Sequence, residues 1–357
     1  MKVSDLQLRD FRSYEQLELS LAGDLIAVIG ANGSGKTNLV EAIHLALQGF
    51  PLRTRRDAAV IRFGCSVARV EARGRRSRDT AFSVVATVDR QQGKRLELDH
   101  GGPASVDDLR RELSALAFTP DRMAVVKGGP IVRRTYVDRM LGRLRPARAA
   151  VPVEYARALA QRNAALRRVR SGASSRDALA PWDAALGQLG SELNSARAEV
   201  IEALAPQFAQ VGLELGLPNP TLAYEPRPVS EAILSEHISR DLERGMTSVG
   251  PHLADLAIAS GDRDMRSYGS QGEQRLTVLA LLLGEAHLMT EERSEPPLLV
   301  LDDVLSELDD DRRKALLANL PKGSQTIVTS TTLRAFPSAG RQPDQTVEVV
   351  PGSARAR

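Results

Sequence analysis

Eight consecutive residues near the N-terminus have the types and spacing of a phosphate-binding loop. Residues 30–37 match the pattern G-x-x-x-x-G-K-[ST], and they follow a short apolar run and precede a stretch of helical periodicity. Glycines allow backbone N–H groups to turn toward phosphate oxygens, and the start of a helix adds about half a positive charge there. The lysine would contact the β- and γ-phosphates, and the threonine would ligate Mg²⁺. The loop therefore predicts a bound nucleoside triphosphate, with an unliganded strand-to-helix turn as the alternative. Its residues are Gly30, Ala31, Asn32, Gly33, Ser34, Gly35, Lys36 and Thr37.

Two carboxylates stand at the end of a second apolar run. Residues 297–301 have the pattern of a buried strand, and Asp302 and Asp303 follow it directly. A first acid at such a position can hold Mg²⁺, and a second can orient or deprotonate the water that attacks the γ-phosphate. The same acids could instead cap the helix that follows. Because the chain also has a phosphate loop, we interpret Asp302 as a metal ligand and Asp303 as a catalytic residue, together with Lys36.

A segment rich in serine and glycine precedes a long apolar helix that we expect at 275–289. Residues 269–273, Gly-Ser-Gln-Gly-Glu, resemble the signature motif of ABC-type ATPases, whose usual form is Leu-Ser-Gly-Gly-Gln. Small residues at the start of a helix leave backbone N–H groups free to bind an anion. The resemblance implies that Ser270 and Gly272 of one copy contact the γ-phosphate held by a second copy, with Ser270 in a catalytic role. An ordinary helix start is the alternative. The roles of the glutamine and the glutamate in this motif stay open.

Apolar runs and alternating patterns indicate the strands that must position these residues. The expected strands lie at 25–29, 297–301 and 326–330, within 67–99, and within 3–21, where a turn at 9–14 separates two of them. Strands followed by helices at both ends of the chain predict an α/β fold.

Helical periodicity indicates the remaining elements. Residues 38–47 and 106–117 are each expected to form a helix. Residues 150–216 show a helical period with a break at 171–175, which predicts a helical hairpin. Residues 351–357 are expected to be a frayed tail.

Composition and charge limit the classes of function that remain. The 357 residues are 42% hydrophobic, as in folded globular proteins, and a single cysteine, Cys65, excludes a disulfide framework and a cysteine-built zinc site. No apolar stretch is long enough for a membrane span, so no membrane partner is expected. The net charge of +3 combines a net of +13 over residues 1–180 with −10 over 181–357. A basic half is typical of proteins that contact a polyanion, although an arginine-rich composition alone would also produce it.

The chain is similar to the bacterial RecF family along nearly its full length. In transporter heads the phosphate loop and the signature lie closer together than here, where 234 residues separate Lys36 from Ser270 and the predicted hairpin lies between them. Heads of the structural-maintenance-of-chromosomes (SMC) type carry far longer insertions at this place. The segments that carry the RecF resemblance are 8–14, 31–43, 118–121, 128–138, 155, 161–163, 182–183, 249–252 and 301–309.

The resemblance implies a fold and further nucleotide contacts. The expected fold is an ABC-type P-loop ATPase head, a mixed sheet flanked by helices, formed by residues 1–120 and 245–357. Residues 121–244 would form an inserted helical lobe. Asn38 and Arg12 would add contacts to the nucleotide, although Arg12 could also be a solvated turn residue.

The resemblance also implies a function in DNA repair, recombination, replication and the SOS response. The expected protein is a weak, DNA-stimulated ATPase that forms an ATP-induced homodimer and uses hydrolysis as a conformational switch. It would bind duplex DNA near single-strand gaps, act with RecR and RecO, and through them help to load RecA. We expect it in the cytoplasm, associated with the nucleoid.

The sequence departs from the patterns of the RecF family and of transporter heads at three places. The family's Ser-x-Arg-Thr segment survives only as Leu52-Arg53-Thr54. After Gly-Pro-His, where the family usually has Arg-Asp, this chain has Leu253 and Ala254. At the end of the strand expected at 326–330, transporter heads carry a histidine. Here residues 329–332 are threonine and serine, so slow hydrolysis is expected. A transport ATPase subunit, a small-molecule P-loop kinase and a non-enzymatic DNA-binding scaffold remain as alternative functions.

Overall fold

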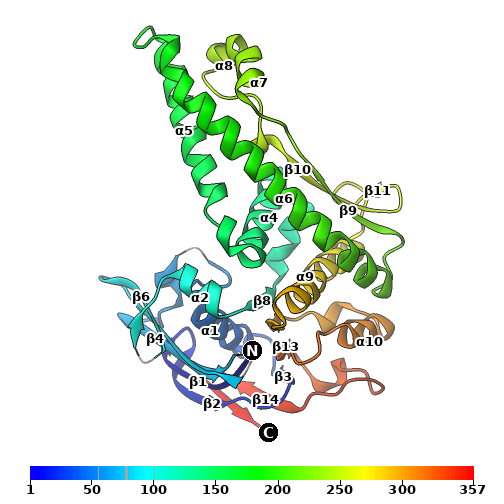
Figure 1. Ribbon diagram of the computed structural model, residues 1–357. Helices are drawn as coiled ribbons and strands as arrows, with labels where there is room; N and C mark the ends of the chain where they lie inside the picture. The colour runs from blue at the N-terminus through cyan, green and yellow to red at the C-terminus, as the bar shows by residue number, and fades with distance from the viewer. Residues whose placement is uncertain (55, 77–78, 100) are drawn as a thin grey trace. The chain divides into compact units, whose positions relative to one another are not determined.

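Contacts divide the chain into two units in the computed structural model, which describes residues 1–54, 56–76, 79–99 and 101–357 (Figure 1). Unit 1 comprises Met1–Met123, Val211–Gly216 and Val278–Arg357, and unit 2 comprises Ala124–Gln210 and Leu217–Thr277. Contacts therefore group residues 245–277 with unit 2. The functional division into a head of 1–120 with 245–357 and an insertion of 121–244 stays a prediction, because contacts alone do not define a functional domain.

One six-stranded sheet of unit 1 brings the predicted chemistry to a single edge. Its strand order is β15-β14-β3-β13-β12-β8, and all neighbours are parallel except β14 and β15. The carboxyl ends of parallel strands meet at one edge, so the residues that follow β3, β12 and β13 lie close together. The strands are β3 (Leu25–Ile29), β8 (Ala115–Phe118), β12 (Leu298–Leu301), β13 (Thr326–Ser330), β14 (Gln345–Val350) and β15 (Ser353–Ala356).

A second, antiparallel sheet of unit 1 has the order β2-β1-β4-β5-β6-β7. Its strands alternate between buried and exposed residues, as expected for a sheet with one face on the core. The strands expected within 3–21 and 67–99 are confirmed, and residues 77 and 78 lie outside the described part of the chain. The turn expected at 9–14 is shorter, because Phe11 already pairs with Tyr14. The strands are β1 (Lys2–Phe11), β2 (Tyr14–Ser20), β4 (Val67–Arg75), β5 (Ala81–Asp89), β6 (Gly93–Leu98) and β7 (Gly102–Pro103).

Helix α1 (Lys36–Gln48) shares one apolar core with both sheets. Every residue from Leu39 to Gln48 is buried, so the helix has no solvated face. Its side chains join core residues of the antiparallel sheet, such as Leu6, and of the parallel sheet, such as Val300. The phosphate loop is thus attached to a helix that the core fixes. Helices α2 (Val106–Glu112) and α10 (Asp310–Ala318) also belong to unit 1.

Two of the expectations for unit 1 were wrong. The helix expected at 106–117 ends at Glu112, and the following residues form β8, because all four of its residues are buried and pair in parallel with β12. The tail expected to fray contains β15, which returns antiparallel to β14. Gly352, with a φ of 78°, forms the tight turn between them, and Ala354 is buried.

Unit 2 consists mainly of helices and a small antiparallel sheet of order β11-β10-β9. The hairpin expected at 150–216 is confirmed as α5 and α6, and the helix expected at 275–289 is α9. Helices α6 and α9 each have residues in both units. Within the described ranges, none of the helices combines the length and apolar character that crossing a membrane requires. The elements are α3 (Ala124–Lys127), α4 (Pro130–Leu144), α5 (Val151–Arg170), α6 (Ala180–Glu214), β9 (Pro220–Glu225), α7 (Glu231–Glu236), α8 (Ile238–Arg244), β10 (Asp255–Ser260), β11 (Arg263–Asp264) and α9 (Gln271–Arg293).

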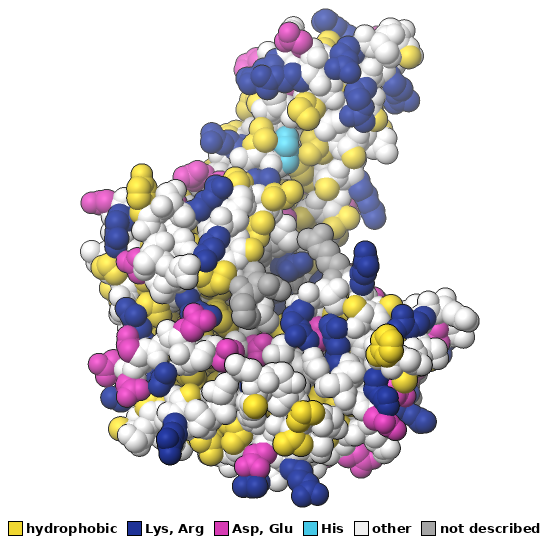
Figure 2. Space-filling model, turned by 180° about the vertical axis from the view of Figure 1, so that it is seen from behind, with side chains coloured by type: hydrophobic (Ala, Val, Ile, Leu, Met, Phe, Trp, Pro, Cys, Tyr) yellow, Lys and Arg dark blue, Asp and Glu magenta, His cyan; other side chains and the backbone are white. Residues whose placement is uncertain are grey.

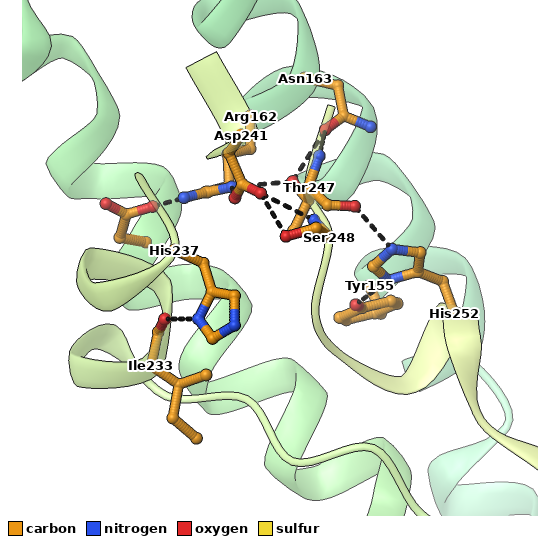
Figure 3. A network of polar contacts seen from close by, with 10 residues as sticks. Tyr155, Arg162, Asn163, Ile233, His237, Asp241, Thr247, Ser248 and His252 are labelled. Atoms are coloured by element: carbon orange, nitrogen blue, oxygen red, sulfur yellow. Dashed lines mark hydrogen bonds and ion pairs between the residues drawn. The ribbon is translucent and has the colours of Figure 1, made fainter. Parts of the chain in front are cut away.

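A fully buried arginine ties together three segments of unit 2 (Figure 3). Arg162 of α5 donates hydrogen bonds to Asp183 of α6 and to Asp241 of α8, both at 2.6 Å. It also donates to the Thr247 hydroxyl at 2.9 Å. Asp241, itself buried, accepts from the backbone N–H and the hydroxyl of Ser248. The charges of Arg162 and Asp241 are therefore buried together and paired.

A histidine beside this network also has a structural partner on each ring nitrogen (Figure 3). His252 Nδ1 lies 2.8 Å from the Tyr155 hydroxyl, and Nε2 lies 3.1 Å from the Thr247 carbonyl oxygen. Burial lowers the pKa of His252, although the hydrogen bond to Thr247 opposes this. His252 accordingly holds the loop that follows α8 through both ring nitrogens.

We expect Asp241→Asn to destabilise unit 2, because it removes one partner of a buried ion pair. Such a loss costs about 3–5 kcal/mol. The protein's single tryptophan, Trp182, packs on the apolar cluster of Ala165, Leu166 and Leu179 in the same unit, so its fluorescence in urea reports this unfolding. Glu243→Gln, at an exposed position of the same helix, is the control and should leave the midpoint unchanged. Equal midpoints for the two variants would contradict the role given to the ion pair.

Candidate nucleotide-binding site

The predicted phosphate loop forms a tight turn between β3 and α1. Gly35 is the N-cap of α1 with a φ of 111°, in the left-handed region that side chains avoid. A Cβ there would lie 3.0 Å from the hydroxyl of Tyr14, which donates to the Gly35 carbonyl oxygen at 3.1 Å. A Cβ at Gly30 would collide with the carbonyl oxygen of Val349. Glycine at these two positions therefore lets the backbone pack closely against its neighbours. It also leaves the start of α1, where an anion is favoured, free of a side chain.

Two polar groups of this loop suit a phosphate-bearing ligand. The Lys36 ammonium donates to the carbonyl oxygens of Gly30 at 2.7 Å and Ala31 at 3.0 Å. Burial lowers the pKa of Lys36, and the charges of Asp303 and Asp302 oppose this change. The Ser34 hydroxyl is buried and has no hydrogen-bond partner within the described part of the chain. An unpartnered buried hydroxyl is costly, so the loop fits a ligand that brings hydrogen-bonding oxygens, as a triphosphate does.

The predicted metal ligands lie together at the end of β12. The Thr37 hydroxyl donates to Asp302 Oδ1 at 3.2 Å, and the Thr329 hydroxyl donates to the same oxygen at 2.7 Å. Burial raises the pKa of Asp302, and the two hydrogen bonds oppose this. A hydroxyl and a carboxylate are the oxygen ligands that Mg²⁺ prefers beside phosphate, so Thr37 and Asp302 fit this ion. Asp303 follows, exposed and with a φ of 51°.

Arg12 and Asn38, the two further residues expected to contact the nucleotide, lie in a cluster of ion pairs and hydrogen bonds. Arg12 donates to both carboxylate oxygens of Glu41, at 2.9 and 3.1 Å, and Arg53 contacts the same carboxylate at 3.0 Å. Burial pushes the pKa of Glu41 upward, but the hydrogen bonds and charges of the two arginines hold it below its usual value. The amide of Asn38 donates to the Ser13 hydroxyl and accepts from Arg53. The nucleotide contacts of Arg12 and Asn38 stay predictions.

The signature segment lies in unit 2, where it begins α9. The Ser270 hydroxyl accepts from the Glu273 N–H at 3.3 Å, and the Glu273 carboxylate accepts from the Ser270 N–H at 2.8 Å, which is a capping box. Glu273 also pairs with Arg263 at 3.0 Å. A Cβ added at Gly272 would meet nothing within 4 Å. The glutamate caps this helix, and its other expected role, as a neighbour of the phosphate site, stays open. The contact of Ser270 and Gly272 with a second copy stays a prediction.

The structure brings together the phosphate loop, Thr37, Asp302 and Asp303 in unit 1. Three further residues around them were not predicted as functional: Tyr14, Glu41 and Thr329. Thr329 had a usable signal, because it stands near the carboxyl end of a strand that the sequence had identified. Tyr14 and Glu41 lay inside family-like segments without an assigned role.

Comparisons with known proteins agree over almost the whole chain. The family model for the RecF/RecN/SMC N-terminal domain matches residues 2–353. The DNA replication and repair protein RecF of Heliobacterium modesticaldum (strain ATCC 51547 / Ice1) is 34% identical over 350 residues, 94% of each chain. RecF of Anaeromyxobacter dehalogenans (strain 2CP-C) is 38% identical over 365 residues, 95% of each chain.

Solved structures show the same fold. A structure of the recombination mediator protein RecF with ATP superposes with a TM-score of 0.86 at 24% identity, and covers 99% of this chain and 97% of that one. An SMC head bound to the C-terminal winged-helix domain of ScpA gives a TM-score of 0.62 at 18% identity, covering 100% and 97%. These matches confirm the predicted ATPase-head fold. With the family model and the sequence identities above, they establish that the chain belongs to the RecF family of DNA replication and repair proteins.

Proposed function

We propose that this protein is an ATP-dependent, DNA-binding recombination mediator. The observation that carries the proposal is the arrangement at one sheet edge, where a phosphate loop with an unpartnered Ser34 hydroxyl lies beside Thr37 and the two acids. A solved relative is a recombination mediator of the RecFOR pathway in complex with ATP. We extend that activity to this chain, with duplex DNA near single-strand gaps as the substrate and with RecR, RecO and indirectly RecA as partners.

Each group of the site has a defined part in ATP hydrolysis. Lys36 exchanges the loop carbonyl oxygens for phosphate oxygens, and the backbone N–H groups at the start of α1 orient the phosphates. Bound Mg²⁺, held by Thr37 and Asp302, would neutralise charge that develops on the phosphates. The Asp303 carboxylate orients the attacking water and accepts its proton. The chain acts as a weak ATPase that DNA stimulates, and hydrolysis serves as a conformational switch.

ATP also joins two copies of the chain. Ser270 of each copy contacts the γ-phosphate held by the other, so nucleotide binding stabilises the closed dimer and hydrolysis releases it. The support is a family signature at a helix N-terminus whose Ser270 hydroxyl accepts within the capping box and keeps its own proton for a donor contact.

The end of the α5–α6 hairpin offers a surface for DNA phosphates. Six exposed arginines gather there, and Figure 2 shows basic side chains crowding this end of unit 2. The side chains of Arg167 and Arg170 lie about 3 Å from the Cβ position of Gly245, so the ends of α5 and α8 are adjacent. Three exposed acids on the same segments leave a positive excess. The arginines are Arg167, Arg168, Arg170, Arg176, Arg240 and Arg244.

Lys36→Ala should weaken ATP binding because it removes a charged donor to the phosphates. Hydrogen bonds to charged groups contribute about 1.5–3 kcal/mol, so the dissociation constant should rise roughly 10- to 100-fold. Titration with a fluorescent ATP analogue measures this, with Lys322→Ala, an exposed lysine of unit 1, as the control. An unchanged affinity would remove Lys36 from the binding site.

Asp303→Asn should retain ATP binding, lose turnover and accumulate as a dimer. The amide keeps the shape of the carboxylate but cannot accept the proton of the attacking water. Light scattering with ATP and Mg²⁺ measures the dimer, and phosphate release measures turnover. Asp311→Asn, an exposed acid of α10, is the control. A monomer under these conditions would refute ATP-driven dimerisation, and normal turnover would remove Asp303 from catalysis.

Removing arginines at the end of the hairpin should weaken duplex binding without changing sequence preference. The logarithm of the affinity falls as the logarithm of the salt concentration rises, and each lost phosphate contact reduces the steepness of this fall by about 1. Arg167→Ala combined with Arg168→Ala should therefore reduce the steepness by up to about 2. Arg355→Ala on β15, combined with Arg357→Ala directly after this strand, is a control of equal charge. Equal slopes for both pairs would place the DNA contacts elsewhere.

A further inference from the structure

Thr329 lies between the phosphate loop and the acidic pair. Its strand, β13, is the neighbour of β3 on one side and of β12 on the other. The side chain is fully buried, one register position beyond the pair formed by Leu301 and Val328. Thr329 thus faces the two residues that directly follow β12.

A single hydroxyl of Thr329 contacts both acidic residues. It donates to Asp302 Oδ1 at 2.7 Å and accepts from the Asp303 backbone N–H at 2.8 Å. The direction is fixed by chemistry, because a backbone N–H can only donate and the hydroxyl must then direct its own proton to the carboxylate. The Thr329 hydroxyl thereby donates to one acidic residue and accepts from the next one in the chain.

These two bonds set different features of the acids. Oδ1 of Asp302 accepts from Thr37 and Thr329, while no contact within the described residues is assigned to Oδ2. Oδ2 is therefore the oxygen left for a metal-bound water. Asp303 has a left-handed φ of 51°, which is unfavourable for a residue with a Cβ, and the bond from its N–H to Thr329 stabilises this turn.

We propose that Thr329 is a positioning residue for nucleotide hydrolysis, and this inference rests on the proposed ATPase function. Its hydroxyl orients Asp302 so that one carboxylate oxygen faces the metal site, and it holds the Asp303 backbone so that the carboxylate projects from the end of β12. Thr329 touches neither substrate nor metal in this scheme and acts through the two acids.

Thr329→Val is the direct test, because valine keeps the shape and branching of threonine and removes only the hydroxyl. The affinity for a fluorescent non-hydrolysable ATP analogue in EDTA should stay the same. The tightening produced by Mg²⁺ and the turnover number should each fall about 10-fold or more, as expected for a lost bond to a charged group. Thr329→Ser restores the hydroxyl and should recover both quantities.

The same strand supplies a matched control. Thr326, at the other end of β13, is also fully buried, but its hydroxyl has no partner within the described residues. Thr326→Val should therefore leave the Mg²⁺ effect and turnover unchanged. A loss in both valine variants would show a general effect of strand substitution and overturn the proposal.

Hydrogen exchange provides a readout that needs no nucleotide. The Asp303 amide should exchange faster in Thr329→Val than in the wild type and in Thr326→Val, because its acceptor has gone. Wild-type exchange, wild-type Mg²⁺ dependence, or no recovery in Thr329→Ser would each overturn the role of the hydroxyl. Failure of the wild type itself to bind or hydrolyse ATP would instead refute the proposed function.

Discussion

One edge of a parallel sheet holds a buried lysine and two carboxylates, and the rest of the site depends on their balance. Burial disfavours the charge of Lys36, and the two acids stabilise it. Burial also disfavours the charge of Asp302. The hydroxyls of Thr37 and Thr329 stabilise this charge by hydrogen bonds and add no charge of their own. A triphosphate with a divalent cation brings charges of both signs to this edge. Hydroxyl groups suit such a site because they orient charged partners whether or not the ligand is present.

Arginines have a different use in each part of unit 2. The segment between residues 122 and 170 is rich in arginine, but two of these side chains are internal. Arg133 forms two 2.7 Å bonds to Asp255, and Arg162 is fully buried. These paired arginines hold the segment that leads from α8 to β10. Six exposed arginines gather instead at the end of the hairpin, apart from the paired arginines that stabilise the fold.

The sequence predicted the elements whose signals are local. The phosphate loop, the acids after β12 and the long hairpin each have a motif or a periodicity of their own, and all lie where expected. The strands β8 and β15 were missed because long-range pairing decides them: Ala115–Phe118 become a strand only beside Leu298–Leu301. Thr329 was not assigned as a site residue although its position near the end of a predicted strand was a signal, because its two contacts depend on β13 lying between β3 and β12.

The helix cap in the signature segment places a charged side chain at the start of α9. Glu273 stands where the usual motif has glutamine, and its carboxylate accepts from the Ser270 N–H, which lowers the pKa of Glu273. A negative charge is thus fixed at the helix start that an incoming phosphate would approach. Arg263 pairs with the same carboxylate and offsets part of this charge. The cap of α9 therefore combines a carboxylate with a neighbouring guanidinium group, where glutamine would place no charge.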